Sequence, residues 1–290
     1  MGTSSSYPGR RNGKPLLPPG HTPMPYPIPP VPHDPQPQPN DPLQPPKPNL
    51  ENTPLNSPAN AWANTRRAFT SLAKAFGAGV AGVGMQRVAR NYTRASGGSK
   101  VLGASAISGQ QGLQRLGGFL ATASSQGVPA AARAIGAGDL TDASSDVVLC
   151  RLVDALAPAP NSLEESWTRS AMTRTIEEWQ NNADLFGEDG AITTPEQSKE
   201  LMTNFIANYA NERFEQEVCG RLDDGILPMD EALKLLEHSR EYILNTIRAG
   251  DQFEHIDPAT FVWEGADGKA LAESALVAAY ALLEDAGVES

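Results

Sequence analysis

The sequence predicts a mostly α-helical protein: an all-helical C-terminal bundle of about five or six helices, preceded by a disordered proline-rich tail and a Gly/Ala-rich basic segment. Three observations lead to this fold class. Residues 1–60 hold 19 of the 25 prolines. No acidic residue lies between Glu51 and Asp139, a stretch that carries nine Lys and Arg. From residue 139 onwards apolar residues recur at helical spacing, and no strong alternating strand pattern appears.

Residues 1–60 form the proline-rich tail. Proline fixes the φ angle, lacks a backbone N–H and biases the preceding residue away from helix. Around residues 23–48 a proline stands at nearly every second or third position. We therefore expect extended, polyproline-II-like structure or disorder. The tail is either a spacer or a docking segment for a partner.

Residues 61–138 form the basic segment, which is rich in Gly, Ala and Ser. Its first part reads as a basic amphipathic helix, because Trp62, Phe69, Leu72 and Phe76 recur at helical spacing. Glycines follow at positions 77, 79, 82 and 84 and in the pairs 97–98 and 117–118. Each glycine costs about 1 kcal/mol relative to alanine in a helix. We therefore expect short helices joined by mobile loops.

The glycines at 77, 79 and 82 also match the G-x-G-x-x-G pattern of dinucleotide-binding loops. Such a loop follows a hydrophobic strand, and an acidic residue lies about 20 positions beyond it. Here a basic helix precedes the glycines and no acidic residue follows until Asp139. We interpret them as close-packing or flexible positions and expect no cofactor.

Residues 139–290 form an acidic all-α domain. Its helix starts are marked by capping residues and prolines: Asp139 or Thr141, the capping box Ser162–Glu165, Thr194 with Pro195 and Gln197, Pro228, and the turn Asp257-Pro258 before a last helix near 268–286. In that last helix Leu271, Ala275, Ala278 and Leu282 lie at helical spacing and predict the buried face.

Charge is distributed unevenly along the chain. The net charge is about +1 for residues 1–60, +6 for 61–149 and −18 for 150–290. The basic residues either bind a phosphate backbone or complement an acidic protein surface, such as the acidic helices of this chain or another subunit. The candidate contact residues are Arg66, Arg67, Lys74, Arg87, Arg90, Arg94, Lys100 and Arg115.

Several classes of protein and site are not supported. Two cysteines, Cys150 and Cys219, exclude a disulfide framework and a Cys-rich zinc site, and both are expected to be buried and inert. No catalytic or metal-binding motif such as H-E-x-x-H or G-x-S-x-G occurs. No apolar run is long enough to span a membrane, so a reduced, cytoplasmic location is expected.

The most specific local feature is the N-terminus. Removal of Met1 would expose the amine of Gly2, whose pKa near 8 leaves it partly neutral and nucleophilic at physiological pH. Residues 1–6 also match the myristoylation pattern, although one lipid chain gives only marginal membrane binding. The alternatives are an ordinary processed terminus, a lipid anchor and a modification acceptor.

The sequence resembles the QatB family, associated components of bacterial Qat anti-phage systems. The resemblance rests on the opening Met1–Gly9 followed by Lys14–Pro19, on Tyr92–Ser105, and on the order of a proline-rich, a basic and an acidic helical part. It implies an operon that also encodes a P-loop ATPase, a QueC-like enzyme and a TatD-like nuclease. QueC-type enzymes activate a deazaguanine carboxylate with ATP, so a QueC-like partner is expected to pass that group to a protein amine.

From this resemblance we expect a non-enzymatic defence-complex subunit with Gly2 as the modification acceptor. Thr3 and Ser4 are expected to contact the partner's active site, and Tyr7, Leu16 and Leu17 to dock the tail. The main alternative is a nucleic-acid-binding adaptor that acts through residues 61–138.

Overall fold

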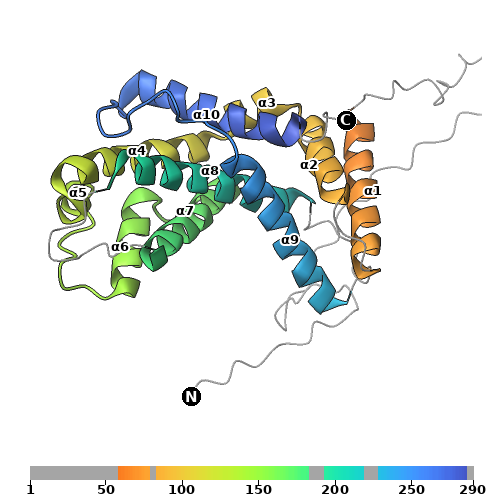
Figure 1. Ribbon diagram of the computed structural model, residues 1–290, viewed down its shortest axis with the longest axis horizontal. Coiled ribbons are helices and arrows are strands. Elements are labelled where there is room, and N and C mark those ends of the chain that lie inside the picture. The colour runs from red at the N-terminus through yellow and green to blue at the C-terminus, as the bar shows by residue number, and fades with distance from the viewer. Residues whose placement is uncertain (1–57, 79–82, 183–192, 219–227, 286–290) are drawn as a thin grey trace, which may run out of the picture. The chain divides into compact units, whose positions relative to one another are not determined.

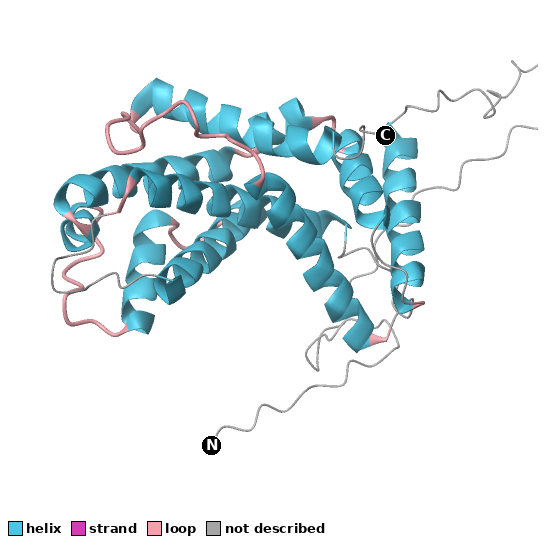
Figure 2. Cartoon of the chain, in the orientation of Figure 1, coloured by secondary structure: helices cyan, strands magenta, loops and turns pink. Residues whose placement is uncertain are grey.

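The computed structural model describes residues 58–78, 83–182, 193–218 and 228–285. These belong to one unit, Thr53–Ser290. Within them the chain forms ten helices and no strand (Figures 1 and 2), which confirms the predicted fold class. The helices are α1 Pro58–Gly77, α2 Val83–Ala95, α3 Ser99–Ser105, α4 Ile107–Gln126, α5 Val128–Ala134, α6 Ser145–Leu156, α7 Leu163–Asn182, α8 Pro195–Val218, α9 Met229–Arg248 and α10 Gly265–Asp285.

Two predicted helix starts are confirmed atom by atom. At α7 the Glu165 N–H donates to Ser162 Oγ, and the Ser162 N–H donates to Glu165 Oε2, which completes the capping box. At α8 Thr194 and Gln197 exchange the same pair of bonds. Both boxes satisfy N–H groups that a helix start otherwise leaves without acceptors.

The predicted start of α6 is wrong. The helix begins at Ser145, after Ser144 as N-cap, rather than at Asp139 or Thr141. Asp139 instead accepts hydrogen bonds from the backbone N–H and the hydroxyl of Thr141, forming a local turn. Cys150 is exposed on this helix rather than buried, because Val148 and Leu152 occupy its inner face. Cys219 lies outside the described residues.

The prediction of short helices in the basic segment is only half right. Helices α3 and α5 have 7 residues each, but α1 and α4 have 20. Glycines in α4 stand where another side chain comes close: a Cβ at Gly109 would lie 2.8 Å from the Tyr209 ring, and one at Gly112 2.8 Å from the Phe205 ring. The packing against α8 therefore offsets the low helix propensity of these glycines.

Helix α8 runs through the centre of the described helices and packs against α4, α7 and α9. Phe205, Tyr209 and Phe214 are fully buried on it. Phe214 also meets Phe69 of α1 and Tyr92 of α2 edge-to-face, with ring centroids 6.2 and 5.3 Å apart. One hydrophobic core therefore joins helices from both sides of position 139.

Helix α10 packs against α2, α3 and α4. Its buried face includes Ala275, as predicted, but Ala278 is exposed and Leu282 only half-buried. The residues one position later, Ala279 and Leu283, are buried instead. At Gly103 of α3 a Cβ would lie 2.4 Å from Val277 Cγ2, so the absence of a side chain there allows the two helices to approach closely.

Candidate functional site

The predicted modification acceptor and docking residues lie outside the described residues. These are Gly2, Thr3, Ser4, Tyr7, Leu16 and Leu17. Glycines 79 and 82 of the G-x-G-x-x-G match lie outside them as well. The predicted basic contact residues, in contrast, are all described.

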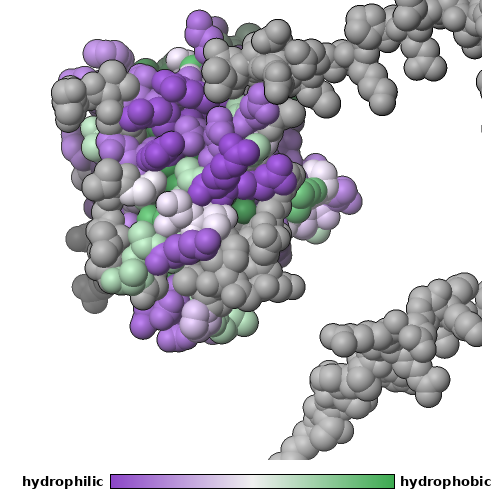
Figure 3. Space-filling model, turned by 90° about the vertical axis from the view of Figure 1, so that its right-hand side faces the viewer, coloured by the Kyte–Doolittle hydropathy of each residue, from purple (hydrophilic) through white to green (hydrophobic). Residues whose placement is uncertain are grey.

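Six of the eight predicted cations lie on two neighbouring helices, α1 and α2, which pack side by side. On α1, Arg66, Arg67 and Lys74 are exposed, while Phe69 and Leu72 face the core. On α2, Arg87 and Arg94 are exposed and Arg90 is half-buried. Both helices are amphipathic: the apolar residues between these cations pack on the core, so the cations lie on the opposite, solvent-facing side. Figure 3 looks onto this side of the molecule, where hydrophilic side chains predominate among the coloured residues.

The described acidic residues neutralise little of this surface. Arg94 Nε lies 4.0 Å from Glu284 Oε1 of α10, a long and exposed ion pair. Among the described residues Arg66, Lys74 and Arg87 have no carboxylate within ion-pair distance. We name Arg66, Arg67, Lys74, Arg87 and Arg94 the α1–α2 cationic face.

The remaining two predicted cations lie on other helices. Lys100 is exposed on α3. Arg115 of α4 donates from Nη1 to the Leu156 carbonyl oxygen at the end of α6, 3.4 Å away. Arg115 also lines a groove of about 550 Å³ between α4, α5, α6 and Trp263. The eight predicted residues therefore do not form one surface.

An open hollow of about 410 Å³ lies on α9, lined by His238, Glu241, Tyr242, Asn245 and Thr246. The His238 ring lies 5.8 Å from the ring of Phe76 at the end of α1. Burial raises the pKa of Tyr242, and the positive charge of Arg90 on α2 acts against this rise. The hollow therefore adjoins α1 and α2, and sequence reasoning missed it because its residues come together only on the surface of a folded helix.

Residues 97–283, nearly two thirds of the chain, match a family described as the Qat anti-phage system associated protein QatB. The chain belongs to the QatB family. Neither the curated proteins nor the solved structures contain a match. As a member of this family the chain is a component of an anti-phage defence system and is associated with the other components of that system.

The QatB match begins at Gly97 and ends within α10, so it includes α3 to α9. The α1–α2 cationic face and residues 1–57 lie before it, whereas the α9 hollow lies inside it. The opening Met1–Pro19, on which part of the resemblance rests, therefore lies outside the matched range.

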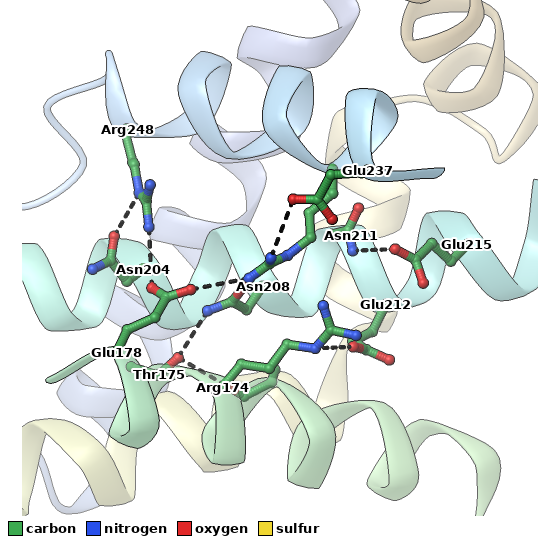
Figure 4. Close-up of polar contacts among 12 residues, drawn as sticks. Arg174, Thr175, Glu178, Asn204, Asn208, Asn211, Glu212, Glu215, Glu237 and Arg248 are labelled. Carbon is green, nitrogen blue, oxygen red and sulfur yellow. Dashed lines mark hydrogen bonds and ion pairs between the residues drawn. The ribbon is translucent and has the colours of Figure 1, made fainter. Parts of the chain in front are cut away.

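Inside the QatB range α7, α8 and α9 meet through a polar network that the sequence did not predict (Figure 4). Glu178 of α7 accepts from Arg240 at 3.0 Å and from Arg248 at 3.1 Å, both on α9. Arg248 Nε also donates to Asn204 Oδ1 of α8, 2.7 Å away. The buried Asn208 of α8 donates from Nδ2 to Thr175 Oγ1, 3.2 Å away. The arginines of α9 are thus matched by carboxylates, whereas Arg66 and Arg87 of the cationic face have no carboxylate partner among the described residues.

A second buried arrangement surrounds Arg213 of α8. Its Nε lies 3.1 Å from Glu217 Oε1, Nη1 donates to the Leu102 carbonyl oxygen, and the guanidinium lies 5.8 Å from the Trp167 ring centroid. Burial alone would lower the pKa of Arg213, but Tyr280, Tyr92 and Glu217 raise it above its ordinary value. Burial raises the pKa of Tyr92, Tyr209 and Tyr280, so these phenols stay neutral. The arrangement joins α2, α3 and α10 to α8.

Two further classes of site are absent from the described residues. No group of three or more His, Cys, Asp or Glu side chains there comes together in a way that would hold a metal ion. No helix within the same residues is long and apolar enough to cross a membrane.

Proposed function

We propose that the chain is a non-enzymatic subunit of an anti-phage defence complex that binds a QueC-like partner enzyme and presents the amine of Gly2 for deazaguanine-type modification. The observation that carries the defence role is the match to the QatB family. The finer proposal is supported by the processed glycine terminus that the sequence predicts, and by the enzyme class that the resemblance implies.

The proposed reaction is an acyl transfer. The carboxylate of the deazaguanine attacks the α-phosphate of ATP on the partner, which forms an acyl adenylate and releases pyrophosphate. The neutral Gly2 amine attacks the carbonyl carbon, AMP leaves, the nitrogen loses a proton and an amide bond remains. Thr3 and Ser4 are small enough to follow Gly2 into a narrow active site.

The proline-rich tail gives the terminus its reach. Between Gly2 and the start of α1 at Pro58 lie 55 residues. At about 3.1 Å per residue in polyproline II such a segment spans up to about 170 Å. The tail docks on the partner through Tyr7, Leu16 and Leu17 while the helical part docks elsewhere on it, and this tethering raises the effective concentration of Gly2 at the active site.

The test is the intact mass and the N-terminal peptide mass of the protein expressed with its neighbouring genes and expressed alone. We expect an addition of deazaguanine size on Gly2 only when the QueC-like gene is present. A Gly2→Pro variant, whose secondary amine is hindered, is expected to lose the addition, and Ser5→Ala is the matched control that keeps it. A bare glycine in both samples would refute the modification, and a fatty-acyl mass would indicate a lipid anchor instead.

A second function is favoured by one observation: Arg66, Lys74 and Arg87 have no carboxylate partner among the described residues. A surface of unneutralised cations attracts polyanions and releases their counterions. On this basis we propose, as the alternative, a nucleic-acid-binding adaptor that acts through the basic segment 61–138. Salt-sensitive binding of DNA or RNA by the purified chain tests it.

A further inference from the structure

The cations of the α1–α2 face differ in their pairing from four arginines of α7, α8 and α9. Arg174, Arg213, Arg240 and Arg248 each lie within 3.1 Å of a carboxylate oxygen. Among the described residues the contact of this kind on the cationic face joins Arg94 and Glu284 at 4.0 Å. Residues 58–78 and 83–95 contain no Asp or Glu at all. Among the described residues Arg66, Lys74 and Arg87 therefore have no carboxylate partner, and their charges are available to an anionic ligand.

The α9 hollow adds an aromatic ring and hydrogen-bonding groups to the surface of cations. Tyr242 offers the face or edge of a ring, Asn245 and Thr246 offer both donors and acceptors, and Glu241 offers an acceptor. Arg90, which acts electrostatically on Tyr242, lies between Arg87 and Arg94 on α2. The hollow thus continues the cationic face towards α9. Its volume of about 410 Å³ falls in the range of about 300–1,000 Å³ found for small-ligand pockets.

We infer that the α1–α2 cationic face and the α9 hollow together bind single-stranded nucleic acid, with Arg66, Arg67, Lys74 and Arg87 on the phosphates and an unpaired base in the hollow beside Tyr242. This inference rests on the second function proposed above and names its ligand. Aromatic side chains that stack bases next to cations that follow the backbone are the usual means of binding single strands.

Glu241 decides between this ligand and two others. A carboxylate in the hollow repels a phosphate or an acidic side chain, which disfavours both a duplex backbone and an acidic peptide at that position. The amino and imino groups of a base are donors that a carboxylate accepts. In a duplex those groups are paired and the ring faces are stacked, so an unpaired base is the ligand that uses both Glu241 and Tyr242.

The salt dependence follows from the four phosphate contacts. For single strands the logarithm of affinity falls with the logarithm of salt concentration with a slope of about −0.7 per contact, hence about −2.8 here. Raising the salt from about 50 to 200 mM is then expected to weaken binding about 50-fold.

The experiment uses the full chain and fluorescence anisotropy with a 20-nucleotide single strand, as DNA and as RNA, and with the duplex. The test variant carries Arg66→Gln, Arg67→Gln, Lys74→Gln and Arg87→Gln. The matched control removes the same charge from α5, α6, α8 and α10 through Arg133→Gln, Arg151→Gln, Lys199→Gln and Lys269→Gln. Circular dichroism verifies that both remain helical. We expect the test variant to lose the salt-dependent affinity and the control to keep it; equal loss in both would overturn the assignment of the surface.

The hollow is tested separately by Tyr242→Leu, with Tyr242→Phe as a control that keeps the ring. Loss of one base stack is expected to weaken single-strand binding about 5- to 150-fold and to leave duplex binding unchanged. Duplex bound as tightly as single strand, or Tyr242→Leu without effect, would overturn the single-strand inference and leave the adaptor function standing. No binding of any of the three nucleic acids at low salt would overturn both.

Discussion

Gly117 and Gly118 of α4 are neighbours, and their substitution by alanine is expected to change the free energy of unfolding in opposite directions. A Cβ at Gly117 would lie 2.2 Å from Cδ2 and 2.4 Å from Cε2 of Trp263. A Cβ at Gly118 would lie 3.9 Å from the Trp263 Cβ, which is ordinary van der Waals contact. The Trp263 ring is 3% exposed, and its Nε1 donates to the Pro258 carbonyl oxygen at 3.1 Å, so it has little room to move.

The two effects can be added for each position. Alanine in place of glycine stabilises a helix by about 1 kcal/mol. Overpacking against a fixed ring costs about 3 kcal/mol, the upper end of the usual range. Gly117→Ala is therefore expected to lower the free energy of unfolding by about 2 kcal/mol, and Gly118→Ala to raise it by about 1 kcal/mol. For a folded part of this size the melting temperature should change by about 4–8 °C downwards and 2–4 °C upwards, respectively.

Urea unfolding followed by circular dichroism at 222 nm measures both changes. In a Trp263→Leu background the smaller side chain should remove most of the cost of Gly117→Ala, so the two substitutions should be strongly non-additive. A Gly117→Ala variant as stable as the parent, or a Gly118→Ala variant destabilised to the same extent, would refute the view that Gly117 exists to admit the indole ring.

Three further predictions concern the buried polar groups and the helix caps. Arg213→Met is expected to cost about 2–3 kcal/mol of unfolding free energy, because the bonds to Glu217 and the Leu102 carbonyl are lost; urea unfolding against an Arg151→Met control checks it. Burial raises the folded-state pKa of Glu215, and the hydrogen bond from Asn211 opposes that rise, so the native state holds its proton to higher pH than the unfolded state does. The contribution of Glu215 to stability is therefore complete below its unfolded-state pKa and is lost as the pH rises through its folded-state pKa. Glu215→Gln should flatten that part of the curve of unfolding free energy against pH. An unchanged curve would contradict the raised pKa of Glu215. Thr194→Ala should cost about 1 kcal/mol through loss of the α8 cap, whereas Thr203→Ala in the middle of the same helix should cost less.

Local signals in the sequence predicted the helices well. The capping boxes at Ser162 and Thr194 involve residues three positions apart, so the sequence contains all their atoms. The predicted buried face of α10 is off by one position. Alanines stand on several sides of this helix, so the sequence gives little contrast between its faces. The prediction that Cys150 is buried was wrong for a similar reason. Apolar residues surround it in α6, and the packing of Val148 and Leu152 determines which face of the helix is buried.

Features that depend on distant residues were not predicted. The length of α4 depends on which ring lies against each of its glycines, and Trp263 is separated from Gly117 by about half of the chain. The network around Glu178 joins side chains of α7, α8 and α9 that are 44 to 70 positions apart in the sequence. The cations of α1 and α2 could be located from the sequence, but the lack of a carboxylate partner for Arg66, Lys74 and Arg87 among the described residues could be seen only in the folded structure.

The hydrogen bond from the Ser99 N–H to Glu284 Oε2, 3.0 Å long, has a consequence for the order of events during synthesis. The acceptor for the first turn of α3 is made 185 residues after the donor. Val277, against which Gly103 packs, and Tyr280, which lies near Arg213, are also made late. Helices α2 and α3 therefore leave the ribosome before α10 exists, and the parts of their surface that α10 covers stay open until it follows. A ribosome that stalls before α10 would hold a chain with these faces uncovered, and release of the last helix is the step that closes the fold.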